Sequence, residues 1–146
     1  MSKKAERMEA EILFFKEDVE LKIDEITVRE WLQKVAGQEK QEIESINFIF
    51  CTDTYLLNIN KEYLKHFDYT DVITFQYHQE GEFITGDIFI SVDRVRENAD
   101  IYNVAFEDEL NHVMVHGLLH LLGYKDSDQD QKKEMREKED FYLNQL

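Results

Sequence analysis

Residues 112–126, HVMVHGLLHLLGYKD, constrain this chain more than any other stretch. Apolar residues recur at the spacing of an α-helix as far as Gly123, and among them His116 and His120 stand four positions apart. Each helical residue turns the chain by about 100°, so the two side chains lie about 40° apart on neighbouring turns. Apolar side chains surround both imidazoles: Leu110, Val113, Met114, Val115, Leu118, Leu119, Leu121 and Leu122. The stretch therefore predicts a helix that brings two imidazoles together in a dry setting.

Two histidines at this spacing also occur by chance on helices, so the residues that follow them carry the argument. Gly123 is suited to the left-handed backbone conformation that ends a helix and reverses the chain. Asp126 then returns a carboxylate toward the histidines. The spacing H-x-x-x-H-x-x-G-x-x-D matches the ligand pattern of the metzincins, with aspartate in the place of the third ligand. We therefore predict that His116, His120 and Asp126 bind one metal ion.

The expected ligand set indicates what the ion does. Two nitrogens and one carboxylate leave a coordination position open, as in catalytic zinc sites. Zinc bound in this way lowers the pKa of its water to about 7, which predicts hydrolysis. In zinc proteases of the H-E-x-x-H type, the glutamate after the first ligand acts as general base, and here that position is Gly117. Peptide hydrolysis by that route is disfavoured. Phosphodiesters are the better substrate class, and the 2′-hydroxyl of RNA also offers an internal nucleophile.

The rest of the chain predicts an α+β fold, a small mixed sheet of about four strands with helices packed on it. Strand patterns occupy residues 11–15, 45–53, 71–77 and 86–91, and the last two suit a hairpin around Gly81. Helical patterns occupy residues 27–37, 54–64, 92–103, 106–123 and 128–146. No proline, repeat or low-complexity stretch marks a linker. We therefore expect residues 1–146 to form a single domain.

Helix ends and packing residues are also predicted. Thr27 suits an N-cap, with Glu30 three residues later, and Gly37 suits the end of the same helix. Asp53 is the expected cap of the next helix. In the last helix, three residues follow helical spacing and are expected to pack on the domain: Met135, Tyr142 and Leu146. The charged residues around them are read as a solvated face.

The composition limits partners and location. Asp and Glu number 32 against 17 Lys and Arg, a formal net charge of −15. Proteins that hold nucleic acid by bulk charge are normally basic, so nonspecific binding is disfavoured and DNA is not an expected partner. No membrane span or secretory signal is evident, and a cytoplasmic location is expected. The only cysteine, Cys51, lies in an apolar run and is read as a buried small hydrophobe.

Four segments together resemble the YbeY family of bacterial metal-dependent endoribonucleases: HGLLHLLGYKD at 116–126, TDVITF at 70–75, GDIFIS at 86–91 and LN at 57–58. The resemblance covers roughly residues 45–140. It implies a zinc-bound endoribonuclease specific for single strands, with one Zn²⁺ per chain. It also implies a role in 3′-end maturation of 16S rRNA and in ribosome quality control, with rRNA and the ribosome or small-subunit ribosomal proteins as partners.

The chain departs from the family pattern at two functional places. The family usually reads G-Y-D-H, so its third ligand, commonly histidine, falls on Asp126, and Lys125 replaces an aspartate. An aspartate ligates zinc through oxygen, and this harder ligand broadens the choice to other divalent metals. Many members also carry an arginine at Leu64, thought to help at the phosphate. Lys65 is the expected substitute, with His66 as the second candidate, although neither has the fork of arginine.

Other polar residues receive supporting roles. Asp71 and Asp87 stand at the ends of predicted strands, and we expect them to order a loop or a ligand by hydrogen bonding. His112 lies one turn before His116 and is assigned to packing or to a substrate groove. His66 and His78 are expected to be exposed. A local basic rim is expected from seven residues: Lys61, Lys65, Arg94, Arg96, Lys125, Lys132 and Lys133.

Two other classes of function stay open. Two histidines and a carboxylate also form the ligand set of non-haem iron oxygenases and of other metallohydrolases, proteases included. Both histidines on one helix, with the carboxylate just after it, favour the zincin-like arrangement over the oxygenase one. The remaining alternative is a ribosome assembly factor that binds without cutting and uses the metal only for structure.

Overall fold

The computed structural model of the protein describes residues 10–66 and 68–146. Its four strands form one mixed sheet in the order β1-β2-β4-β3. β1 pairs in parallel with β2, β2 in parallel with β4, and β3 pairs antiparallel with β4. The strand bounds are β1 (Glu11–Lys16), β2 (Ile43–Cys51), β3 (Val72–Gln76) and β4 (Ile84–Ser91). The predicted α+β class, the small mixed sheet and the β3–β4 hairpin are confirmed.

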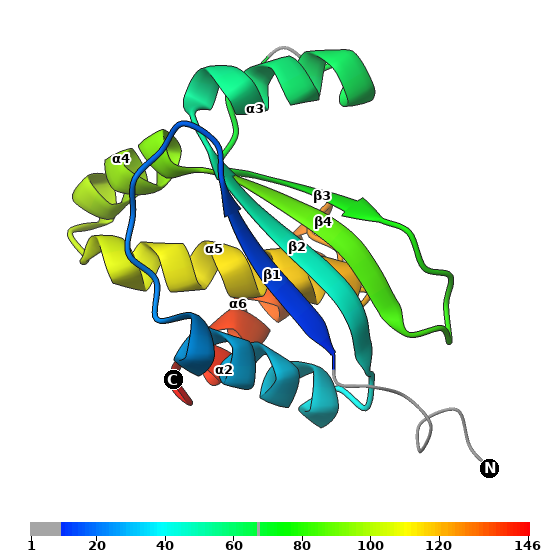
Figure 1. Ribbon diagram of the computed structural model, residues 1–146. Helices are drawn as coiled ribbons and strands as arrows, with labels where there is room; N and C mark the ends of the chain where they lie inside the picture. The colour runs from blue at the N-terminus through cyan, green and yellow to red at the C-terminus, as the bar shows by residue number, and fades with distance from the viewer. Residues whose placement is uncertain (1–9, 67) are drawn as a thin grey trace.

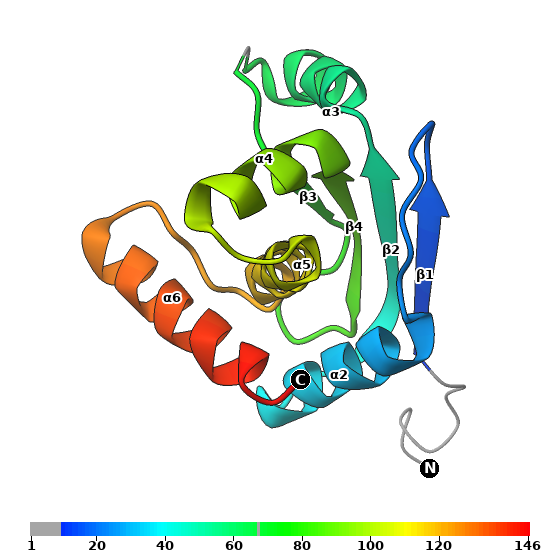
Figure 2. The same ribbon diagram turned by 90° about the vertical axis from the view of Figure 1, so that its left-hand side faces the viewer.

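The helices lie around this sheet. Their bounds are α2 (Glu25–Gln38), α3 (Asp53–Ile59), the π-helix η1 (Asn60–Leu64), α4 (Val92–Tyr102), α5 (Phe106–Leu121) and α6 (Gln129–Leu143). Helix α5 crosses one face of the sheet, and α3 lies beyond the carboxyl end of β2 (Figure 1). Viewed from the side, α5 lies between the sheet and α6 (Figure 2). The helix that carries the histidine motif is therefore the central helix of the fold.

The core explains why α5 takes this place. Alternate residues of the central strands point to the same side, and Phe48 of β2 and Ile88 of β4 are fully buried there. Met114 and Leu118 of α5 are equally buried in the same hydrophobic cluster. A helix that is apolar on nearly every side is stable only when both sides are covered. The sheet covers one side of α5 and α6 lies on the other (Figure 2), and His116 and His120 are half-buried on this helix.

The opposite face of the sheet is partly covered by α3. Leu56 of that helix packs with Cys51 and Ile73 in a second, smaller hydrophobic cluster. Cys51 is fully buried, as predicted, and this burial raises the pKa of its thiol to about 12. The thiol is therefore protonated and enclosed, and its role is packing.

The predicted caps of the first helix were wrong. Helix α2 begins at Glu25, and its N-cap is Asp24, whose carboxylate accepts hydrogen bonds from the backbone N–H of Thr27 at 3.2 Å and from its hydroxyl at 2.7 Å. One carboxylate satisfies two donors, which a capping threonine does not do. The helix also runs one residue past Gly37, and the left-handed residue behind it is Lys40, with φ 61°.

The next helix also differs in its start and its regularity. Thr52, and not Asp53, is the N-cap of α3, and its hydroxyl accepts the backbone N–H of Tyr55 at 3.1 Å. Asp53 instead pairs with the guanidinium of Arg94 at 2.7 Å. The predicted helix over residues 54–64 is present, but its second half widens into η1 and ends at Lys65 in the left-handed conformation, φ 58°. His66, the next residue, lines a cavity together with His116 of α5.

The burial of residues in the last helix and of His78 agrees only in part with the predictions. Met135 and Tyr142 are buried against the domain as expected, whereas Leu146 is 45% exposed. His78 was expected to be exposed but is half-buried, and its ring nitrogens face the backbone of Thr85 at 3.1 Å and the carbonyl of Leu121 at 3.1 Å. His78 thus ties the hairpin to the end of the histidine helix. Among the described residues, no helix has the length and apolar character of a membrane span.

Candidate metal centre

His116 and His120 lie on one face of α5, half-buried among the apolar residues of that helix. Their ring centroids are 4.6 Å apart, and their Nε2 atoms face each other at 3.1 Å. Burial first, and the neighbouring His116 second, lower the pKa of His120 below that of an ordinary histidine. A neutral imidazole is the form that binds a metal, so the setting favours ligation.

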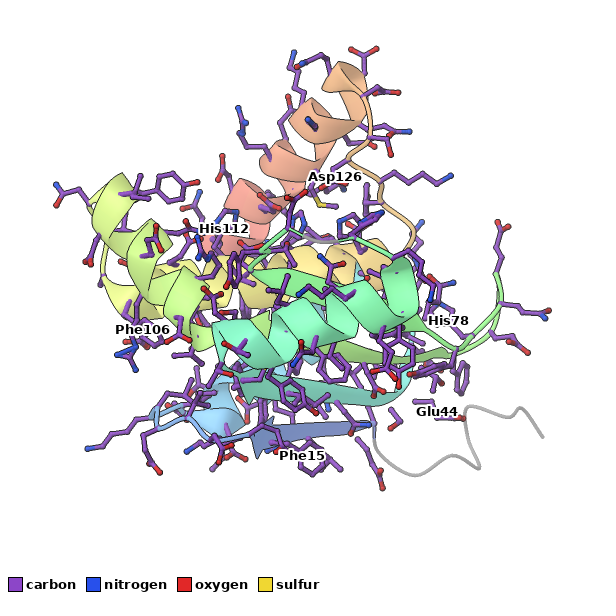
Figure 3. The ribbon with its side chains drawn as sticks, turned by 90° about the horizontal axis from the view of Figure 1, so that it is seen from above. Phe15, Glu44, His78, Phe106, His112 and Asp126 are labelled. Carbon is purple, nitrogen blue, oxygen red and sulfur yellow. The ribbon has the colours of Figure 1, made fainter. Side chains whose placement is uncertain are left out.

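The chain behind α5 brings a carboxylate to the same point. Gly123 has φ 113°, the left-handed conformation that the sequence predicted, and the N–H of Tyr124 donates to the carbonyl of Leu119 at 3.0 Å. This reversal leaves Oδ2 of Asp126 3.6 Å from Nε2 of His116 and 3.5 Å from Nε2 of His120. Asp126 and His112 lie on the same side of α5, next to α6 (Figure 3).

The three facing atoms fit a divalent ion. A tetrahedral ion with bonds of about 2.0–2.2 Å needs its ligand atoms roughly 3.3–3.6 Å apart. The separations between the Nε2 atoms of His116 and His120 and the carboxylate oxygen of Asp126 are 3.1, 3.5 and 3.6 Å. These three atoms could therefore bind one metal ion with only small movements of the side chains. A tetrahedral ion bound by three protein atoms has a fourth coordination position for another ligand.

The comparison with known proteins decides the family. The sequence pattern of the family described as Endoribonuclease YbeY matches residues 13–146. This chain belongs to the YbeY family. A Cytophaga hutchinsonii relative named Endoribonuclease YbeY is 47% identical over 137 residues, covering 93% of this chain and 96% of the relative. A Flavobacterium psychrophilum relative of the same name is 46% identical over 130 residues, covering 88% and 92%. The resemblance seen in the motifs is confirmed, and it extends beyond residues 45–140.

A solved structure agrees with the fold. The solution structure of a Thermotoga maritima protein has a TM-score of 0.66 to this chain at 29% identity, and the match covers 91% of this chain and 87% of that one. The YbeY chain described here therefore shares its arrangement of sheet and helices with a protein whose structure was determined in solution.

His116, His120 and Asp126 are called the triad below. Each of its two histidines has its second ring nitrogen, Nδ1, next to a hydrogen-bond partner. Nδ1 of His120 faces the carbonyl of Tyr124 at 3.0 Å, so the turn that delivers Asp126 also orients His120. Nδ1 of His116 faces Oε2 of Glu139, a buried carboxylate on α6. Histidines that bind metals commonly donate this second N–H to a carbonyl or carboxylate, which fixes the tautomer and the ring orientation. The arrangement leaves both Nε2 atoms free to face Asp126.

His112 belongs to the support of the site. Its Nδ1 lies 3.2 Å from Oε1 of Glu109 and its Nε2 lies 2.8 Å from Oε1 of Glu139. Hydrogen bonds to Glu109 and then to Glu139 raise the pKa of His112 to about 10. Burial opposes ionisation of Glu139, yet the hydrogen bonds from His112 and His116 lower its pKa to about 2. These hydrogen bonds favour a protonated His112 held between two carboxylates, an electrostatic contact that differs from both the packing and the substrate-groove roles suggested by the sequence.

Sequence reasoning missed Glu109 and Glu139. Glu139 lies in the segment that was read as a solvated face, but it is only 6% exposed. A signal was present: Met135, Glu139 and Tyr142 stand at positions i, i+4 and i+7, and all three are buried on one side of α6. A carboxylate on the buried stripe of a helix indicates a partner on the helix it faces.

A cavity of about 380 Å³ opens beside the triad. Its described lining consists of Asn60, Leu64, His66, residues 70–74, His116, His120 and Asp126. Among these residues there is no lysine or arginine, and Lys65 does not line the cavity, whereas His66 does. Asp71 lines it as well, and burial raises the pKa of its carboxyl against the opposing influence of His116. The wall opposite the histidines therefore comes from η1 and the chain after it.

Two other predicted polar residues lie away from the triad. Asp87 is within β4, where it accepts hydrogen bonds from Asn47 at 3.0 Å and from the hydroxyl of Tyr77 at 2.9 Å. It orders neighbouring strands. Arg94 of the expected basic rim is engaged by Asp53 and Glu97, so its charge is largely matched inside the domain.

The position of Gly117 explains the missing glutamate. A Cβ atom built there would lie 2.8 Å from Cγ2 of Ile88 on β4. Real Cβ atoms do not approach another carbon this closely, so α5 meets the sheet where only glycine fits. In this YbeY protein, the residue after the first histidine points into the sheet and away from the triad.

Proposed function

We propose that this chain is a metal-dependent endoribonuclease that cuts single-stranded RNA, acting in 3′-end maturation of 16S rRNA and in ribosome quality control. The triangle formed by His116, His120 and Asp126 carries the proposal, because its edges of 3.1–3.6 Å suit one divalent ion and leave a position open. Membership of the YbeY family, whose relatives are named endoribonucleases, supports RNA as the substrate. We propose that residues 1–146 act as a single domain in the cytoplasm.

We propose zinc as the ion, with His116, His120 and Asp126 as its ligands. A zinc ion held there would supply a Lewis acid for the phosphoryl group and would lower the pKa of its bound water toward neutrality. The protein contributes orientation, since Tyr124 and Glu139 hold the two imidazoles by their Nδ1 atoms. An oxygen ligand also suits other divalent metals, so the metal found in the cell depends on availability as well as on the site.

The alternatives differ in what they require of the chain. A peptidase of the H-E-x-x-H type requires a carboxylate after the first ligand, and Gly117 is packed against Ile88. An assembly factor with a structural metal requires the ion for folding, whereas the triad lines a cavity, and its three residues are outside the main hydrophobic cluster. We propose that docking to the ribosome or to small-subunit ribosomal proteins, and not bulk charge, brings the RNA to this acidic protein.

The test combines metal content with cleavage. We expect elemental mass analysis of untagged protein to find about one zinc per chain, and to find the metal lost or weakened in Asp126→Ala at an unchanged circular dichroism spectrum. We expect the wild type to cut a labelled single-stranded RNA and to spare the same sequence in a duplex. A wild type that holds no metal, or whose metal is indifferent to Asp126, contradicts the proposal and supports a role in binding alone.

Lys65 is the proposed phosphate contact, and His66 is the second candidate. A charge-assisted hydrogen bond contributes about 1.5–3 kcal/mol, so we expect Lys65→Gln to lower kcat/KM by roughly 10–100-fold while the metal content is unchanged. His66→Gln is the matched comparison, because His66 lines the cavity and Lys65 does not. If Lys65→Gln cuts at the wild-type rate and His66→Gln does not, the phosphate contact belongs to His66.

A further inference from the structure

Glu139 lies outside every motif that points to the metal site. It comes 13 residues after Asp126, near the end of α6, and it is 6% exposed. Met135 and Tyr142, on the same side of α6, are buried in the main hydrophobic core. This packing fixes α6 against the side of α5 that carries His112 and His116, so the Glu139 carboxylate is held against two consecutive turns of the histidine helix.

Both carboxylate oxygens of Glu139 are used by histidines of α5. Oε1 lies 2.8 Å from Nε2 of His112, and Oε2 is in contact with Nδ1 of His116. The other nitrogen of His112 faces Oε1 of Glu109 at 3.2 Å, and Glu109 is 4% exposed. A chain of contacts therefore runs from the buried Glu109 through the partly exposed His112 and the buried Glu139 to the first histidine of the triad.

We infer that Glu139 is the positioning residue of the metal site: it holds His116 in the tautomer that carries its proton on Nδ1, so that Nε2 faces His120 and Asp126. The inference rests on the proposed metal-binding role of the triad. A carboxylate can only accept a hydrogen bond, so Nδ1 of His116 must be the donor, which leaves the Nε2 lone pair for a metal. His112, whose other nitrogen faces Glu109, engages the second oxygen of the same carboxylate.

The two histidines of the triad are thereby held by different partners. His120 is oriented by a neutral backbone carbonyl, that of Tyr124, at 3.0 Å. His116 is oriented by the carboxylate of Glu139, a charged acceptor. A change at Glu139 should therefore act on His116 and leave the orientation of His120 intact, which distinguishes positioning from a general loss of packing.

Glu139→Gln tests the inference, because it keeps the size of the side chain and removes its charge. In metal-free protein, we expect ¹⁵N-histidine NMR to find His116 protonated at Nδ1 in the wild type and divided between both tautomers in Glu139→Gln, with His120 unchanged. Competition with a chelating dye should find zinc affinity lowered by about 10–100-fold. The control is Glu137→Gln, an exposed glutamate on the same helix, which should match the wild type in both measurements.

Several outcomes overturn the inference. It fails if the His116 tautomer and the zinc affinity of Glu139→Gln equal those of the wild type, or if His116 of the wild type carries its proton on Nε2. Glu139→Asp serves if the glutamine variant does not fold, and unchanged zinc affinity in a folded Glu139→Asp also counts against it. A wild type that binds no zinc contradicts the proposed function, whereas the tautomer of its metal-free form still tests Glu139.

Discussion

We expect His116→Ala to abolish metal binding and RNA cleavage in a domain that remains folded. In the proposed site, His116 supplies one of three ligand atoms, with Nε2 3.1 Å from that of His120 and 3.6 Å from Oδ2 of Asp126. A lost ligand removes the Lewis acid from the reaction, and a loss of about 4 kcal/mol in transition-state stabilisation corresponds to a roughly 1,000-fold slower rate. Metal per chain, by elemental mass analysis, and the rate of single-strand cleavage measure the two losses.

The fold of His116→Ala separates the enzyme from the assembly factor. The imidazole is 21% exposed, and its removal costs Glu139 one of two donors, a penalty of about 1–3 kcal/mol. Domains are typically stable by about 5–15 kcal/mol, so we expect a cooperative thermal transition at a modestly lower temperature. His66→Ala, the control from the cavity wall, should keep its metal. An unfolded His116→Ala together with an intact, non-cleaving wild type would favour a structural metal.

The approach of His116, His120 and Asp126 could be predicted because it is encoded locally. His116 and His120 are fixed by the pitch of one helix, and Gly123 determines the reversal that returns Asp126, so all three lie within 11 residues of sequence. The strands could also be predicted from the sequence, because alternation along β2 and β4 places every second residue in the core. For these residues, the predictions that depend on spacing within a short stretch of sequence agree with the structure.

The missed cap of α2 was a choice between neighbouring residues, whereas the missed roles of His78 and Glu139 depend on contacts between distant segments. Asp24 and Thr27 are both good capping residues, and the choice fell on Asp24 because its carboxylate meets two donors of the same threonine. His78 reads as a loop residue until the hairpin is folded against the carbonyl of Leu121. Glu139 becomes part of the site only when α6 packs on α5, 23 residues away from His116 in sequence. The spacing of α6 indicates that Glu139 is buried, but the partners of Glu139 and of His78 are set by tertiary packing.

Gly117 and Gly37 are expected to respond to alanine with opposite signs. Gly117→Ala places a Cβ 2.8 Å from the side chain of Ile88, and overpacking of this kind typically costs about 1–3 kcal/mol. Gly37 lies on the exposed side of α2 with nothing within 4 Å of an added Cβ, so alanine there should stabilise the protein by about 0.5–1 kcal/mol through helix propensity. Chemical denaturation of the two variants beside the wild type measures both changes.

Gly117→Glu carries the same steric conflict and adds a charge with no partner. A buried charge without a partner costs about 3–5 kcal/mol beyond the overpacking, which approaches the whole stability of a typical domain. We expect the variant to be unfolded or to melt at least about 8–16 °C lower, and to gain no peptidase activity. Ile88→Ala should partly rescue Gly117→Ala by removing the atom that it meets. A folded, stable Gly117→Glu would contradict this packing. The glutamate of the zinc proteases has no room here, because α5 lies too close to β4 at Gly117. The close packing of the histidine helix on the sheet therefore excludes the general base that those proteases use.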